Sequence, residues 1–212
     1  LDKDERFANT YLLAWTTTPW TLPGNVALAI NSNIKYVKIE TENTKLILAK
    51  SRLSTIKTEY KILEEINTKD LLGKSYESVF DYYINDKKRK NIENAFKVYE
   101  ADFVTEDDGS GIVHIAPAFG SDDYDLSLKY NLPFIQHVNT NGKFKEEVTD
   151  FKGQDVKPKE DHQKADIEII KYLAKKESLF AKEKIIHSYP HCWRCDTPLL
   201  NYASSSWFVK VT

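Results

Sequence analysis

Short apolar runs separated by turn residues dominate the first part of the chain. The runs are rich in β-branched and aromatic residues, which favours strands over helices. The strands predicted there are Tyr11–Trp15, Val26–Ile30, Tyr36–Glu40, Lys45–Ala49, Glu59–Ile66, Phe96–Phe103 and Ile112–Ile115. Two more strands are predicted near the end, Ile185–Ser188 and Ser206–Val211.

Helical periodicity is clearest in His162–Lys176, where one face is apolar and the other carries lysine and glutamate. Ser121–Tyr130 is a second predicted helix, with Ser121 as its N-cap. Shorter helical pieces are predicted at Lys50–Lys57 and Thr68–Leu72. Many strands followed by few helices, with no regular strand–helix alternation, predict an α+β fold. We expect a β-barrel-like mixed sheet with peripheral helices.

The 212 residues are enough for one sizeable domain. The chain begins at Leu1 and contains no Met, so we expect an insert excised from a larger protein. Its terminal strands, about 1–15 and 185–212, would form a stem towards the missing part. No apolar run approaches the roughly 18 residues of a membrane helix, and no signal peptide is evident. A cytoplasmic protein without a membrane partner is therefore expected.

Charge limits the contact with nucleic acid, because the net charge is only -2. A domain that held RNA alone would usually be basic, so any RNA contact must be local or depend on further protein. Asn85–Asn94 is polar and rich in lysine. It is either a solvated surface loop, the more common case, or a local patch that contacts RNA.

Three consecutive threonines, Thr16, Thr17 and Thr18, leave a predicted strand and enter a loop that contains Pro19. Strand alternation would point Thr16 and Thr18 one way and Thr17 the other. Proline cannot donate to a strand ladder, so pairing should stop at Pro19. Clustered hydroxyls at a strand end suit a sugar, a phosphate or an ester, although threonine also simply favours strands. Trp20 and Asn25 follow in the same irregular loop.

A second segment runs from Asp108 to Tyr124 and reads as turn, strand, loop and helix start. Asp122 and Asp123 would lie in the first helical turn, where carboxylates complement the helix dipole. One aspartate is enough for that purpose, so the other is free to meet a substrate cation. His114, in an apolar strand, is by residue type more often a packed histidine than a catalytic one.

Cys192 and Cys195 form a single Cys-x-x-Cys pair in His187–Cys195. With His187 or His191 they could supply a zinc site, but two reduced structural cysteines fit better, and we predict no metal. A phosphate-binding glycine loop, a nucleophilic serine elbow and a His-Glu-x-x-His motif are all absent from the sequence.

Together, the segments Thr16–Asn25, Gly111–Tyr124, His187–Cys195 and Trp207–Val211 resemble the inserted editing domain of isoleucyl-tRNA synthetases. This domain, connective peptide 1, belongs to class I aminoacyl-tRNA synthetases. The resemblance covers nearly the whole chain. Thr18 stands where the related valyl and leucyl enzymes carry an arginine. The wording from His114 to Gly120 looks more like the archaeal and eukaryotic branch than the bacterial one.

The resemblance implies hydrolysis of valine misattached to tRNA for isoleucine. One methylene gives a synthetic site only about 1–3 kcal/mol of discrimination, so a second, smaller pocket removes the errors. The partners would be the tRNA 3′ end carrying valine and the rest of a monomeric synthetase. The synthetic core, which uses ATP and Mg²⁺, is missing, so the fragment itself would need no cofactor.

The resemblance also implies roles for residues. Asp123 would hold the α-ammonium group of valine, with Asp122 beside it in the substrate site. Thr16, Thr17 and Thr18 would bind the terminal adenosine and help to place the attacking water. His114 would line the side-chain pocket and exclude isoleucine, and Trp20 and Asn25 match further pocket positions.

Three other functions stay open from the sequence, one of them a small zinc-binding module built on the cysteine pair. A related editing domain could clear threonine from tRNA for valine, although the Thr18-Pro19-Trp20 wording argues against it. A non-catalytic insert that docks tRNA is the second alternative, and it would bind tRNA without hydrolysing it.

Overall fold

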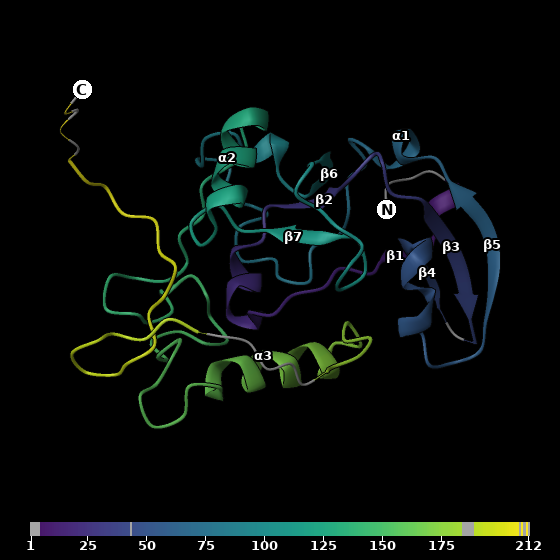
Figure 1. Ribbon diagram of the computed structural model, residues 1–212. Coiled ribbons are helices and arrows are strands. Elements are labelled where there is room, and N and C mark those ends of the chain that lie inside the picture. The colour runs from purple at the N-terminus through teal and green to yellow at the C-terminus, as the bar shows by residue number, and fades with distance from the viewer. Residues whose placement is uncertain (1–4, 43, 184–188, 208, 210, 212) are drawn as a thin grey trace.

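The computed structural model describes residues 5–42, 44–183, 189–207, 209 and 211. Within them, seven strands form two mixed sheets, one of four strands and one of three. The two longer helices, α2 (Ser121–Tyr130) and α3 (Lys164–Lys175), lie above and below the smaller sheet in the view of Figure 1. The short helical elements are η1 (Glu5–Phe7), η2 (Pro19–Gly24), η3 (Lys50–Thr55), α1 (Thr68–Leu71) and η4 (Ile92–Asn94).

The larger sheet has the strand order β1-β4-β3-β5. Its strands are β1 (Thr10–Leu12), β3 (Tyr36–Thr41), β4 (Lys45–Ala49) and β5 (Tyr60–Ile66). β1 runs parallel to β4, whereas β3 is antiparallel to both of its neighbours. Both faces of β3 and β4 are largely buried, which explains why these strands read as nearly continuous apolar runs.

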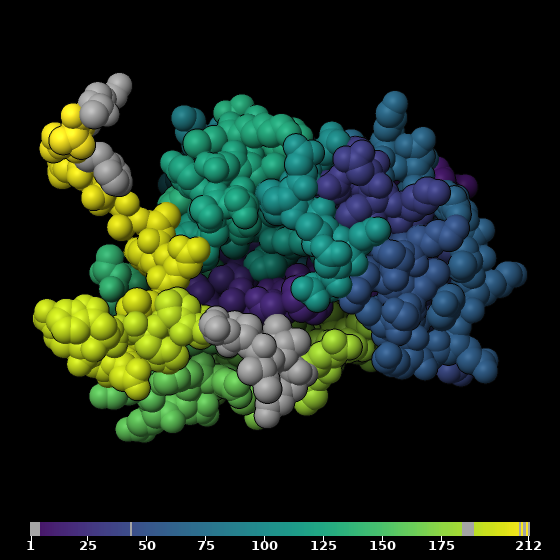
Figure 2. Space-filling view, viewed as in Figure 1, coloured from purple at the N-terminus to yellow at the C-terminus, as the bar shows by residue number. Residues whose placement is uncertain are grey.

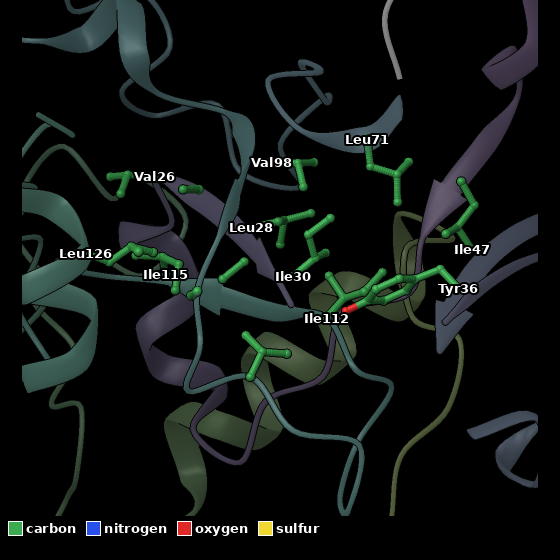
Figure 3. Close-up of a cluster of buried hydrophobic side chains, with 14 of the residues drawn as sticks. Val26, Leu28, Ile30, Tyr36, Ile47, Leu71, Val98, Ile112, Ile115 and Leu126 are labelled. Carbon is green, nitrogen blue, oxygen red and sulfur yellow. The ribbon is translucent and has the colours of Figure 1, made fainter. Parts of the chain in front are cut away.

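The smaller sheet places β2 (Ala27–Ile30) between β6 (Lys97–Glu100) and β7 (Val113–Ile115). β2 is parallel to β6 and antiparallel to β7, and all four of its residues are buried. Figure 3 shows how side chains of this sheet, such as Leu28 and Ile30, point into one apolar cluster with Val98 and Leu71.

The two sheets meet where the chain enters β7. The Tyr36 hydroxyl of β3 donates to the carbonyl of Gly111 at 2.7 Å, and Ala49 N of β4 donates to Ser110 O at 2.9 Å. A Cβ at Gly111 would lie 2.5 Å from the Ala49 Cβ, and its φ of +74° also favours glycine. Trp15, just after β1, bridges to Val113. β7, which carries His114, is therefore anchored to both sheets.

The prediction of an α+β fold with mixed sheets and peripheral helices is confirmed. The bounds of β4 and α2 agree with the sequence prediction. The N-cap prediction was wrong, because Gly120 occupies that position and Ser121 is already helical. No helix in the described ranges is long and apolar enough to cross a membrane.

Two predicted strands at the end of the chain have different outcomes. Ile185–Ser188 lies outside the described residues. In Ser206–Val211 the prediction was wrong for the described residues, 206, 207, 209 and 211, which form no strand. Trp207 is 99% exposed there, so its apolar side chain has no sheet to pack against.

Candidate functional site

The threonine segment leaves the larger sheet and turns into η2 under the smaller one. Thr16 and Thr18 are half-buried and Thr17 is exposed, as the predicted alternation requires. Pairing ends with the bridge at Trp15, before Pro19, and Pro19 is the first residue of η2. Proline suits that position because its fixed φ is helical and its missing N–H is not needed. The turn is closed by Thr18 N, which donates to Thr16 Oγ1 at 3.1 Å.

His114 on β7 contacts this segment, although it lies far from it in the sequence. Its Nε2 lies 3.3 Å from Thr16 Oγ1 and 3.1 Å from Thr21 Oγ1. Thr21 Oγ1 also donates to Thr18 O at 2.8 Å. Because this uses the only hydroxyl proton of Thr21, His114 Nε2 must be the donor in its contact with Thr21. The ring proton is thereby assigned to Nε2.

The other ring nitrogen of His114 has no partner. Nδ1 is buried and receives no hydrogen bond within the described part of the chain. Burial lowers the pKa of His114 to about 4, so the ring is neutral at pH 7. A neutral ring with one committed nitrogen offers shape and a hydrogen bond, and it is a poor acid at neutral pH.

Asp123 lies in the first turn of α2, directly beyond β7. Its Oδ2 accepts a hydrogen bond from Ala116 N at 2.8 Å. Among the described residues, nothing donates to Oδ1. Gly120 makes this placement possible, because a Cβ there would lie 2.9 Å from the Asp123 Cγ. One carboxylate oxygen is thus fixed by the backbone and the other is left for a ligand.

Burial raises the pKa of the Asp123 carboxyl. The hydrogen bond from Ala116 N acts in the opposite direction, and the neighbouring charge of Asp122 adds to the increase. Asp122 itself is exposed. The fold therefore holds Asp123 as a carboxyl whose charge is poorly solvated, which favours pairing with a cation.

The two groups belong to one end of β7. Ala116, which binds Asp123, is two residues after His114, or about 7 Å along an extended chain. Figure 2 shows a hollow in this face, with purple N-terminal and teal atoms at its floor. The structure thus brings the threonines, His114 and Asp123 into one neighbourhood, although they are far apart in the sequence.

Trp20 and Asn25 are buried rather than open to the surface. Trp20 is 2% exposed and packs edge-on against Phe119 with ring centroids 5.1 Å apart. Asn25 donates to Ala27 O at 2.8 Å and accepts from the Tyr76 hydroxyl. Both residues fix η2 against the smaller sheet.

Three residues of this neighbourhood were missed by the sequence analysis, namely Thr21, Tyr76 and His137. His137 is fully buried, and its Nε2 lies 2.9 Å from Trp20 O, to which it can donate. Asp166 of α3 accepts from Trp20 N at 3.0 Å and is paired with Lys157. These contacts span up to 146 residues, so no local pattern could have predicted them.

A small cavity of about 200 Å³ opens beside the start of α2. Pro117, Ala118, Gly120, Ser121 and Tyr124 line one side, and Asn201, Tyr202 and Ala203 line the other. The second side is held in place by Ala203 N, which donates to Ala118 O at 2.9 Å. The cavity is adjacent to Asp123 and is the size of a small organic group.

The cysteines form no disulfide, and Cys195 is exposed. Cys195 Sγ lies 3.1 Å from Thr197 Oγ1. In the described part of the chain, no three residues among the histidines, cysteines and acidic residues are grouped so that they could hold a metal ion. His187, the alternative ligand, lies outside the described residues.

Relatives of known name cover almost all of this chain. No protein-family model matches it. The chain is 52% identical over 204 residues, or 96% of its length, to the isoleucine–tRNA ligase of Clostridium acetobutylicum. It is 50% identical to the ligase of Clostridium novyi and 45% to isoleucine–tRNA ligase 2 of Bacillus anthracis, again over 96% of its length. These relatives are bacterial, so the expected archaeal or eukaryotic type is not supported.

Solved structures resemble the fold in part. A crystal structure titled GlLeuRS-CP1 has a TM-score of 0.48, with 22% identity over 57% of this chain and 44% of that one. The cytosolic leucyl-tRNA synthetase editing domain of Plasmodium falciparum has a TM-score of 0.43, with 18% identity over 57% and 47%. The sequence relationship is the closer one. Over nearly all of its length, the chain is similar to a segment of bacterial isoleucine–tRNA ligases, and it spans about a fifth of their length.

Proposed function

We propose that this chain is the editing domain of an isoleucyl-tRNA synthetase and hydrolyses valyl-tRNA for isoleucine. The observation that carries the proposal is the carboxylate of Asp123, with one oxygen fixed by Ala116 N and the other without a donor among the residues that the structure describes. Asp123 is bound through Ala116, two residues after His114, and the His114 ring contacts the hydroxyls of Thr16 and Thr21. Similarity to isoleucine–tRNA ligases over 96% of the chain supports the same assignment.

Asp123 binds the α-ammonium group of the aminoacyl ester. A charge-assisted hydrogen bond to Oδ1 is the strongest polar contact the site offers. The bound cation also relieves the cost of holding an ionised carboxylate in a partly buried place. An aspartate engaged in this way is poorly placed to accept a proton, so we assign it to anchoring and not to general base catalysis.

The threonine segment binds the terminal adenosine and positions the water. Thr17 is exposed, and Thr16 and Thr18 are half-buried, so all three side chains are at least partly accessible to a ligand. Water attacks the ester carbonyl, the bond from the carbonyl carbon to the ribose oxygen breaks, and the ribose oxygen takes up the proton. Holding water and ester in register can supply several kcal/mol of the barrier reduction. No covalent intermediate is needed, because the ester is already activated.

His114 acts as the size filter. Its ring is buried, neutral and held by Thr16 and Thr21, so it presents a fixed wall to the amino-acid side chain. Isoleucine exceeds valine by one methylene, and a rigid wall converts that difference into a clash. Trp20 and Asn25 support this wall from behind by fixing η2. Asp122 contributes through its charge beside Asp123.

The whole synthetase would supply what this chain lacks. With a net charge of -2, the domain has little general attraction for RNA. We therefore assign the hold on the tRNA body to the remainder of a monomeric synthetase, and only the 3′ end to this chain.

Hydrolysis of valyl-tRNA and isoleucyl-tRNA for isoleucine tests the proposal directly. Both esters are incubated with this chain and with an Asp123→Ala variant, and the same change is made in the full-length synthetase. We expect loss of valine only, and a rate at least about tenfold lower in the variant. Release of both amino acids at equal rates, unaffected by the variant, would refute the proposal. Stable tRNA binding without hydrolysis, in the chain and in the synthetase, would show a docking insert instead.

A further inference from the structure

A basic hollow lies beside the segment between β5 and β6, and no threonine lines it. It has a volume of about 490 Å³. The residues that line it are Asp86, Lys88, Arg89, Lys90, Asn91, Leu132 and Phe134. Three of these side chains are cationic and one is acidic, in a chain whose net charge is negative. The hollow is therefore positively charged although the chain as a whole is negatively charged.

The cations of the hollow differ in how they are held. Arg89 is committed within the fold, because its Nε and Nη2 contact Asp86 Oδ2 at 3.0 and 2.9 Å. Its guanidinium also lies 5.1 Å from the centre of the Tyr83 ring. Lys88 and Lys90 are exposed, and neither pairs with a carboxylate in the part of the chain that the structure describes. Arg89 thus holds the loop, and the two lysines are left to attract an anion.

The loop is tied to the far end of α2. Arg89 Nη1 donates to Phe134 O at 3.3 Å, and Asn94 Nδ2 donates to Asn131 O at 3.0 Å. Asn131 ends α2 in a left-handed conformation. Since α2 has ten residues, it is about 15 Å long. The hollow is therefore fixed about one helix length from the aspartate at the start of α2.

Apolar side chains lie between the hollow and the start of α2. Tyr124, next to Asp123, packs edge-on against Phe134 with ring centroids 6.2 Å apart. Tyr124 is 42% exposed, Phe134 is 40% exposed, and Leu128, one helical turn after Tyr124, is 61% exposed. Large apolar side chains that are exposed next to one another are uncommon on protein surfaces and usually mark a binding site. Tyr124 also lines the small cavity beside Asp123.

We propose that Lys88, Lys90, Phe134 and Tyr124 form a binding surface for single-stranded RNA that leads to Asp123. Aromatic faces stack bases without regard to sequence, and cations beside them neutralise the phosphates. Both components are present here in one continuous strip. A protein partner would not need two unpaired lysines around an aromatic pair, and duplex RNA offers no exposed base faces for stacking. The inference rests on the proposed function only for the direction of the strand, with its 3′ end at Asp123.

The geometry also explains how a nearly neutral domain handles RNA. The positive charge is confined to the place where the strand enters, and the carboxylate lies where the ammonium group arrives. The opposite signs at the two ends of α2 would orient a strand that carries phosphates along its length and a cation at its tip. Of the two interpretations of the lysine-rich loop that the sequence allows, this favours the RNA contact.

A fluorescent single-stranded RNA of twelve nucleotides that ends in CCA tests the surface. Its dissociation constant is measured by anisotropy across a range of salt concentrations, with the chain as it is and with a Lys88→Ala/Lys90→Ala variant. Each phosphate contact on a single strand contributes about 0.7 to the slope of log K against log salt. We expect binding to weaken by about tenfold at low salt, and the slope to fall by about 1.4. A Phe134→Ala variant should weaken binding by at least about fivefold and leave the slope unchanged.

The matched control removes two lysines elsewhere. Lys171 and Lys175 on α3 are exposed, so Lys171→Ala/Lys175→Ala makes the same change in net charge. Equal weakening by the control variant and the Lys88/Lys90 variant would refute the proposed surface, as would a Phe134→Ala variant that binds like the parent chain. If valyl-tRNA is hydrolysed and the Lys88/Lys90 variant binds RNA as tightly as the parent chain, the proposed surface is refuted and the proposed function stands. If the variants reduce binding and no ester is hydrolysed, the surface stands and the proposed function fails.

Discussion

The site has two halves that the fold treats differently. The half formed by His114 and the threonines is closed around Nε2 of the ring, which lies 3.3 Å from Thr16 Oγ1 and 3.1 Å from Thr21 Oγ1. The half formed by Asp123 is open, with one oxygen bound to Ala116 N and the other bound by no residue in the described ranges. Hydrogen bonds around the His114 ring hold its position and so set the shape of the site. A carboxylate oxygen without a partner can bind a cationic ligand. We infer that the first half supplies selectivity and the second supplies affinity.

The largest effect is expected from removing the charge in the open half. Asp123→Asn keeps an oxygen for Ala116 N and loses the partner of the ammonium group. A hydrogen bond to a charged group is worth about 1.5–3 kcal/mol, which corresponds to roughly a 10- to 150-fold fall in kcat/KM for valyl-tRNA. Asp122→Asn, which alters an exposed carboxylate one residue away, should lower it by less than about threefold. Equal losses in the two variants would contradict the anchoring role.

Stability separates this loss from misfolding. Burial raises the pKa of Asp123, so its ionisation is less favourable in the folded state than in the unfolded state. The folding stability linked to the protonated form is therefore present at low pH and lost as the pH rises through the raised pKa. An asparagine does not ionise, so Asp123→Asn should unfold in denaturant at pH 7 with an equal or higher free energy than the parent chain.

A substitution in the closed half should change the selectivity for valyl-tRNA over isoleucyl-tRNA. His114→Ala removes the wall and leaves a cavity into which the extra methylene of isoleucine fits. We expect the preference for valyl-tRNA over isoleucyl-tRNA to fall by about tenfold, in line with the 1–3 kcal/mol that a methylene commands in a pocket. The measurement is the ratio of the two hydrolysis rates. If the variant hydrolyses both esters more slowly and the ratio of the rates is unchanged, His114 supports the loop and does not set selectivity.

The two halves also differ in how far they could be predicted from the sequence. β4, β7 and α2 were predicted closely, because a strand or helix is encoded in neighbouring residues. The place of Asp123 in the first turn of α2 and the alternating exposure of the threonines were predictable for the same reason. The network of the closed half was not, since Thr16 and His114 are 98 residues apart and Thr21 carries no local signal. The strand predicted at Ser206–Val211 failed in the opposite way, because its described residues, 206, 207, 209 and 211, pair with no strand despite their alternating pattern.

The pH dependence of hydrolysis gives a smaller and sharper test of the open half. Asp123 must be ionised to bind the ammonium group, so the rate should be full above its pKa and fall as the pH drops through it. Because burial and Asp122 raise that pKa, the fall should begin at a higher pH than for an ordinary aspartate. Asp122→Asn removes one cause and should shift the acid limb to lower pH. A shift to higher pH, measured in rate profiles from pH 4 to 8, would contradict this account.

The smallest effect is expected behind the site, at the hydroxyl of Tyr76, which donates to Asn25 Oδ1. Tyr76→Phe leaves that buried oxygen without its partner and should cost about 1–3 kcal/mol of unfolding free energy. Asn25 keeps its bond to Ala27 O, so η2 stays in place and the selectivity for valine should change by less than about twofold. Denaturant unfolding and the ratio of the two hydrolysis rates are measured on the same preparation. If selectivity fell as far as in His114→Ala, the position of η2 and not the imidazole wall would set the size limit, and the division between a shaping half and an anchoring half would have to include the loop behind them.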